Sequence, residues 1–180
     1  GINSANLNST YTTFEIAENN IALNSSCTTN VNTTIVGINN TDGTATTNKI
    51  ISSNNITVTG LNSGGTSIGI NIGRTGILDA NLNTITISNF NTNIYGLLLT
   101  TGCTTNTVNG NIITISPIGM PVTSNILGIS NNVGVASISG NEITISPTIT
   151  PLANTTITSY GINNAVANSS ITNNPKIHIT

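Results

Sequence analysis

The stretch ISSNNITV, residues 51–58, contains the phrase on which the fold depends. The apolar residue Ile51 is followed by two spacers and Asn54, and then Ile56 and Val58 alternate with polar residues. Six copies of this phrase occur along the chain, and their asparagines are Asn19, Asn54, Asn83, Asn111, Asn141 and Asn174. Successive asparagines lie 35, 29, 28, 30 and 33 positions apart. A repeat of this period indicates a solenoid, and apolar residues at alternate positions indicate β-strands.

A second phrase, apolar–Gly–apolar, alternates with the first. Its glycines are Gly37, Gly69, Gly96, Gly128 and Gly161, and the chain opens on half of the same phrase, Gly1-Ile2. Two phrases per repeat predict two or three short strands per coil, joined by connections of variable length that project outward. We therefore expect one solenoid domain over residues 1–180, with coils at approximately 1–35, 36–67, 68–94, 95–126, 127–159 and 160–180.

The composition favours an all-β fold. Asn and Thr number 33 each and Ile 30, so single matches to a phrase can arise by chance. Six matches in order, each separated from the next by one Gly phrase, indicate a true repeat. The formal net charge is only −2 and Ile is abundant, which argues against intrinsic disorder. Ile, Val and Thr favour extended backbone, and no segment has sustained helical spacing of apolar residues.

Stacking of the coils predicts two inward columns and one ladder. The columns, which would form a continuous core, are Ile21, Ile56, Ile85, Ile113, Ile143, Ile177 and Leu23, Val58, Ile87, Ile115, Ile145, Ile179. Asn tolerates left-handed backbone, so we expect each repeated Asn to occupy a bend between strands. Amides stacked coil upon coil would hydrogen-bond to one another. The extra residue Pro175 in the last phrase lacks a main-chain donor, which would suit a bulge or an approaching end of the stack.

Such a ladder at Asn19, Asn54, Asn83, Asn111, Asn141 and Asn174 resembles the right-handed parallel β-helix of the pectate-lyase-like superfamily. The resemblance implies a single-stranded, right-handed β-solenoid. Members of that superfamily include enzymes that act on acidic polysaccharides, with clustered aspartates, or with acidic calcium ligands and an Arg or Lys base. The Asn- and Thr-rich, nearly uncharged composition also resembles large secreted surface repeat proteins of Bacteroidota.

The titratable residues do not form a recognisable active site. The acids are Glu15, Glu18, Asp42, Asp79 and Glu142, and the bases are Lys49, Arg74, Lys176 and His178. They belong to different coils, whereas paired carboxylates for glycoside hydrolysis must lie within about 5–10 Å. We interpret them as solvated charges on loops or strand exteriors, and we expect no enzyme activity, cofactor or metal. Cys27 and Cys103 fall in different phases of the coil, so we predict that both are unpaired.

Outward positions beside the core columns contain small hydroxyl residues. One column has Thr57, Thr86, Thr114 and Thr144, and the next has Thr59, Ser88, Ser116 and Ser146. Two such columns, about 6.6 Å apart along each strand and 4.8 Å between coils, resemble the Thr-x-Thr faces of ice-binding solenoids. The alternative is that Thr is simply favourable on a solvated strand.

Three functions remain open. The leading hypothesis is a non-enzymatic structural segment of an extracellular adhesin, stalk or filament, because no catalytic cluster is evident and both end coils look open. Its partners would be neighbouring coils or copies stacked end to end, and cell-surface glycans are a further candidate partner. The alternatives are a carbohydrate-binding or tailspike-like β-helix, with a groove from residues 117–125 and 147–159, and an ice-binding solenoid. Three cationic side chains cannot neutralise a run of phosphates, and no stretch could span a membrane, so we expect no nucleic-acid partner and no membrane insertion.

Overall fold

The computed structural model describes residues 1–4, 13–25, 34–41, 47–63, 65–73, 76–90, 92–100, 104–118, 124–148 and 156–180. These residues form three parallel sheets of six strands each. Every pair of neighbouring strands is parallel, as in Ile56↔Ile85 and Ile85↔Ile113. The predicted all-β parallel solenoid is confirmed.

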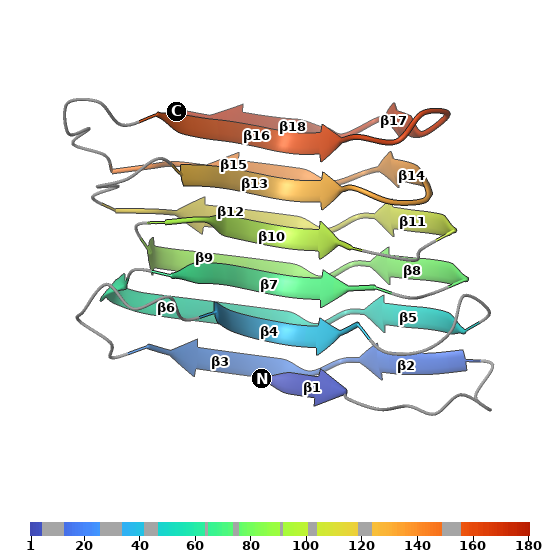
Figure 1. Ribbon diagram of the computed structural model, residues 1–180, viewed down its shortest axis with the longest axis horizontal. Helices are drawn as coiled ribbons and strands as arrows, with labels where there is room; N and C mark the ends of the chain where they lie inside the picture. Colours follow the sequence, from blue (N-terminus) through green and yellow to red (C-terminus); the bar gives the residue numbers. More distant parts are fainter. Residues whose placement is uncertain are drawn as a thin grey trace.

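Each coil adds one strand to sheet A, then one to sheet B and one to sheet C, so the sheets grow together along the stack (Figure 1). Sheet A contains β1 (Ile2–Ser4), β4 (Thr34–Asn40), β7 (Thr66–Ile72), β10 (Ile94–Leu99), β13 (Ser124–Asn131) and β16 (Ile157–Asn164). Sheet B contains β2 (Thr13–Ala17), β5 (Asn48–Ser52), β8 (Ile77–Asn81), β11 (Thr105–Asn109), β14 (Val135–Ser139) and β17 (Ser170–Thr172). Sheet C contains β3 (Asn20–Asn24), β6 (Asn55–Ser63), β9 (Thr84–Phe90), β12 (Ile112–Ser116), β15 (Glu142–Ile145) and β18 (Lys176–Ile179).

The repeated Asn phrase spans the corner between sheets B and C. The residue that turns this corner is the one before the ladder Asn, with a positive φ at Glu18, Ser53, Leu82, Gly110, Gly140 and Asn173. Each ladder Asn lies in the bend between strands as expected, but the left-handed conformation that Asn tolerates is adopted by the residue before it. The physical reason is that the Asn must direct both its main-chain N–H and its amide at the next coil, so the preceding residue makes the turn. Gly fills that position in two coils because it adopts positive φ without strain.

The glycines of the second phrase form a column in sheet A that contacts the isoleucines of sheet C. A methyl group built on Gly96 would lie 2.5 Å from the carbonyl oxygen of Gly128 and 2.6 Å from Cγ2 of Ile113. The same approach recurs along the stack in the pairs Gly37–Ile56, Gly69–Ile85, Gly128–Ile143 and Gly161–Ile177. Both repeated phrases are thus parts of one contact, in which an isoleucine packs against bare backbone.

The predicted inward columns form the sheet C side of the core, and buried residues of sheets A and B, such as Ile70 and Ile51, complete it. Ile56, Ile85, Ile113 and Ile143 are fully buried, and they are aligned in register from one coil to the next. In the sixth coil the equivalent Ile177 is 47% exposed, because no further coil lies above it in the structure. Burial of each coil's apolar residues therefore depends on the coil next to it.

We predict that Gly96→Ala lowers the free energy of unfolding by about 3 kcal/mol, because the added methyl group overpacks the core against a carbonyl oxygen that cannot move aside. The measurement is the urea midpoint followed by circular dichroism. Thr114→Ala, an outward substitution in the same coil, is the control and should stay within about 0.5 kcal/mol. An unchanged midpoint for Gly96→Ala would mean that sheet A adjusts to a side chain at this column.

Candidate functional site: the asparagine ladder and the outward hydroxyl columns

The predicted ladder is present at the corner between sheets B and C. The main-chain N–H of Asn54 and its Nδ2 both donate to Oδ1 of Asn83, at 3.1 and 2.9 Å. The same Nδ2 also donates to the carbonyl oxygen of Ile16, at 2.9 Å. Equivalent bonds join every successive pair from Asn19 to Asn174. The side chains of Asn54, Asn83, Asn111 and Asn141 therefore link their own coil to both neighbours.

Burial makes these bonds important for stability. Asn83, Asn111 and Asn141 are fully buried, and a buried polar group without a partner destabilises a fold by about 1–3 kcal/mol. Pro175 does not interrupt the ladder, since the N–H and Nδ2 of Asn141 each lie 3.0 Å from Oδ1 of Asn174. The pairing Ile143↔Ile177 keeps its register as well, so the extra residue is accommodated within the corner.

We predict that Asn111→Asp destabilises the fold by about 3 kcal/mol or more at neutral pH, because the new carboxylate is buried and cannot donate to Oδ1 of Asn141. Burial raises the folded-state pKa of that carboxyl group above its unfolded value of about 3.9. The destabilisation should therefore be smallest below about pH 4 and grow as the pH rises toward the folded-state pKa. Thermal unfolding of the variant across this pH range is the measurement.

Asn55→Asp is the matched control, because Asn55 adjoins ladder residue Asn54 but is exposed. It should change the thermal midpoint little and without a comparable pH dependence. If Asn111→Asp proves as stable as this control at neutral pH, the ladder hydrogen bonds do not limit stability.

Two further polar columns were missed by the sequence reasoning. On the exterior of sheet A, Asn71 Nδ2 donates to Asn39 Oδ1, and Asn39 Nδ2 donates to Asn3 Oδ1, both at 2.9 Å. The available signal was an Asn two positions after the Gly in the first three coils. In the interior, where sheet A meets sheet B, Asn106 Nδ2 donates to Asn131 Oδ1 at 3.2 Å and Asn131 Nδ2 to Asn164 Oδ1 at 2.7 Å. The available signal was an Asn three positions after the Gly, which occurs at Asn131 and Asn164, whereas Asn106 lies in sheet B outside that phrase.

The outward hydroxyl residues lie side by side on sheet C. Thr57, Thr86, Thr114 and Thr144 are paired in register through β6, β9, β12 and β15. Thr59, Ser88 and Ser116 are likewise in register, and Ser146 N–H donates to Ile115 O directly after β15. All eight are half-buried, which leaves their outer atoms in contact with solvent. The face is thus a regular array of small polar groups at strand spacing.

Lys49 is not a solvated charge, and that interpretation is wrong for this residue. It is only 1% exposed and occupies an inward position of sheet B, in register between Phe14 and Leu78. Its Nζ donates to the carbonyl oxygens of Asn40, at 3.1 Å, and Gly73, at 2.5 Å. The aliphatic stem packs in the core while the ammonium group binds carbonyls from two successive coils.

The described acids remain scattered, with one alignment that was not anticipated. Glu15 pairs with Ile50, and Ile50 pairs with Asp79, so the two acids occupy one outward column of sheet B, two strands and roughly 10 Å apart. Ile50 lies between them and Glu15 is exposed. Within the described residues, no group of three or more His, Cys, Asp or Glu side chains could hold a metal ion. Asp42, Arg74, Cys27 and Cys103 lie outside those residues, as do 119–123 and 149–155 of the two expected groove loops.

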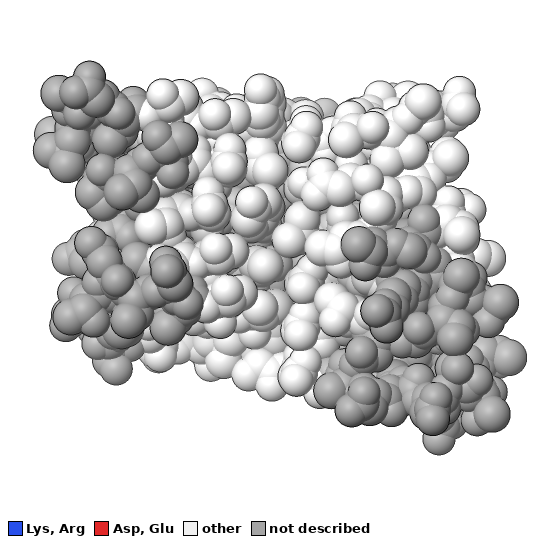
Figure 2. Space-filling model, viewed as in Figure 1, with Lys and Arg blue, Asp and Glu red and all other residues white. Residues whose placement is uncertain are grey.

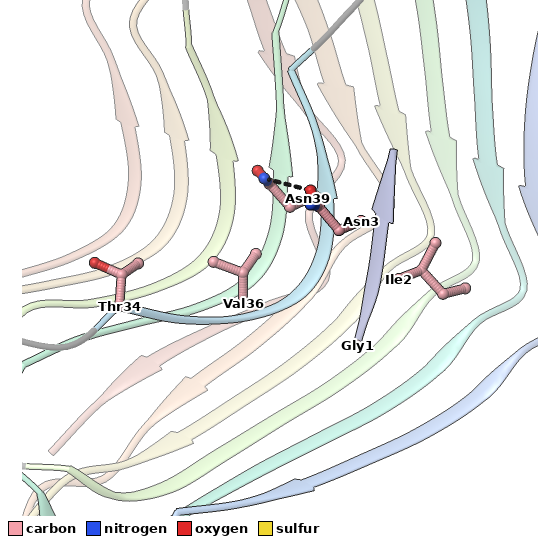
Figure 3. A pocket seen from close by; sticks show the side chains of 6 residues that line it. All are labelled: Gly1, Ile2, Asn3, Thr34, Val36 and Asn39. Atoms are coloured by element: carbon pink, nitrogen blue, oxygen red, sulfur yellow. Dashed lines mark hydrogen bonds between the residues drawn. The ribbon is translucent and has the colours of Figure 1, made fainter. Parts of the chain in front are cut away.

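Sheet A has neither charged side chains in its strands nor a catalytic cluster at its pocket. Figure 2 shows no charge on the described part of this face. A depression of about 300 Å³ is lined by Gly1, Ile2, Asn3, Thr34, Val36 and Asn39. In Figure 3, Thr34, Val36, Asn3 and Asn39 point into the concave side of the bent strand β4, and Ile2 points away. This lining contains no titratable side chain.

No protein-family model, curated protein or solved structure matches the chain. The structure alone therefore supports the parallel β-solenoid and its asparagine ladder. Membership of the pectate-lyase-like superfamily remains a prediction. Within the part of the chain that the structure describes, no helix has the length and apolar character needed to cross a membrane.

Proposed function

We propose that this chain is a non-enzymatic structural segment of an extracellular adhesin, stalk or filament, in which stacked coils supply length and stiffness. The observation that supports this role best is the continuous ladder from Asn19 to Asn174, which ties every coil to the next through buried hydrogen bonds. The ladder runs beside the isoleucine columns, so polar and apolar contacts hold the same interfaces between coils. A stack of this kind extends by one strand spacing, about 4.8 Å, with every coil.

The chemistry of the described surface also favours a structural role over catalysis. The strands of sheet A have no charged residue, Glu15 and Asp79 on sheet B are separated by Ile50, and Glu142 on sheet C is in register with Lys176. A nearly neutral exterior of Asn, Thr and Ser remains hydrated without attracting strongly charged ligands. This exterior suits a spacer that holds another part of an assembly away from a surface.

We predict that pulling the protein by its ends in a single-molecule force experiment releases coils successively rather than all at once. Each release should add roughly 100–120 Å of chain, because a coil of about 28–35 residues extends by about 3.3–3.6 Å per residue. Asn111→Asp should lower the force at which the fourth coil is released, because its bonds to the fifth coil are weakened. Thr114→Val, outward on the same coil, should leave that force unchanged.

Two outcomes would contradict a structural role. One is collapse of the whole stack in a single low-force event that the ladder variant does not alter. The other is specific binding on a glycan array, or depolymerisation of a polysaccharide, which would favour the carbohydrate-binding alternative.

A second candidate function is ice binding, and the in-register columns on sheet C favour it. Replacing Thr86, Thr114 and Thr144 by Tyr should then abolish thermal hysteresis, because bulky side chains break the regular array. Thr107→Tyr, outward on sheet B, is the matched control and should retain the activity. Absence of thermal hysteresis in the unsubstituted protein would exclude this function.

A further inference from the structure

Two asparagines followed by a small residue differ in a way that sequence alone does not indicate. They are Asn109-Gly110, at the end of β11, and Asn168-Ser169, between β16 and β17. In such pairs the main-chain nitrogen of the second residue can attack the side-chain amide carbon of the Asn. A C–N bond forms, the amide nitrogen leaves as ammonia, and water opens the resulting succinimide to aspartate or isoaspartate. Gly offers the least steric hindrance to this attack, so the sequence points to Asn109.

At Asn109 both reacting groups are engaged in hydrogen bonds. The attacking nitrogen, Gly110 N, donates its proton to the carbonyl oxygen of Ser139 at 3.1 Å. The amide is held as well, because Ser139 Oγ donates to Asn109 Oδ1 at 3.3 Å. The main-chain N–H of Asn109 is bound to Asn81 Oδ1, at 3.2 Å. Attack therefore requires the corner between sheets B and C to open.

At Asn168, by contrast, the reacting groups are not held in hydrogen bonds among the described residues. Asn168 is exposed, with a φ of 61°, in the turn that joins sheet A to sheet B in the sixth coil. Among the described residues, neither its side chain nor the main-chain N–H of Ser169 has a hydrogen-bond partner. The turn is held through other groups: Ala136 N–H donates to Ser169 Oγ at 3.1 Å, Asn164 Nδ2 to Val166 O at 2.8 Å, and Ala165 N–H to Asn131 O at 2.9 Å. The nucleophilic nitrogen and the amide carbon can thus meet without breaking a ladder bond.

The ladder asparagines are protected by the same principle as Asn109. The N–H that follows Asn83, Asn111 and Asn141 donates to the ladder Asn of the preceding coil: Thr84 to Asn54 O, Ile112 to Asn83 O and Glu142 to Asn111 O, at 2.8, 2.8 and 2.9 Å. Their amides are held by the neighbouring coils. Succinimide formation at these positions requires local unfolding of the stack.

We propose that Asn168 is a deamidation site of the folded protein and converts before Asn109. The inference does not depend on the structural role proposed above. Conversion places a negative charge on an exposed turn, and isoaspartate also lengthens the main chain there, while every ladder bond remains intact. The fold therefore directs spontaneous deamidation away from the side chains that hold the stack together.

The test is incubation of the folded protein at mildly alkaline pH, followed by proteolysis and mass-spectrometric quantification of aspartate and isoaspartate at both positions. Asn168 should convert at least about tenfold faster than Asn109, which corresponds to a difference of about 1.4 kcal/mol in activation free energy between the two sites. In the same chain unfolded in urea, the order should reverse, because Gly110 is then the less hindered neighbour. Conversion of Asn109 at or above the rate of Asn168 in the folded protein would overturn the proposal.

Ser169→Thr is the variant that tests the chemistry at Asn168, because Thr keeps the oxygen that accepts from Ala136 N–H. A branched side chain hinders attack by the following nitrogen, so conversion at Asn168 should fall while Asn109 is unaffected. Circular dichroism establishes that the variant is folded. An unchanged rate at Asn168 in the folded variant would show that the succinimide route does not operate there.

Discussion

The structure depends on one hydrogen-bonding arrangement, in which the side-chain oxygen of a buried Asn accepts both donors of the Asn one coil earlier. For Asn83, these donors are the N–H and Nδ2 of Asn54. The Asn83 amide in turn donates to Ile51 O and Asn111 Oδ1. All polar groups of the side chain are thereby satisfied away from water, which a buried amide requires. No single coil can provide these partners, so the corner is stable only within a stack.

The ladder and the glycine column together set the register of the coils. A shift by one residue along a strand would exchange inward and outward side chains. It would also move Ile113 from the bare backbone of Gly96 and Asn111 from its acceptor on Asn141. Apolar packing and hydrogen bonding thus both disfavour a shifted register. The variable connections between strands need not help to determine the fold.

Some structural positions could be predicted from the sequence, and others could not. Ladder and core positions could be predicted because stacking forces the same residue type to recur at a regular spacing. Lys49 could not, because it takes the inward place of Phe14 and Leu78 in neighbouring coils through contacts with Asn40 and Gly73 that spacing does not reveal. The left-handed residue before the ladder Asn could not be predicted either, since Glu18, Ser53 and Leu82 share no residue type. The hydroxyl columns were recognisable as a pattern, but a pattern does not specify a ligand.

The three corners of the coil are constrained to very different degrees. The corner that stabilises the stack is therefore not the one where a recognition surface could vary. In the first five coils, the corner between sheets B and C contains only the left-handed residue and the ladder Asn, and the sixth adds Pro175. An insertion there must preserve a buried hydrogen bond to each neighbour, so this corner can vary little. The spacing between successive ladder asparagines nevertheless varies, and the extra residues must enter at the other two corners. A surface that distinguishes one such solenoid from another therefore belongs at those corners or on the outward sheet faces.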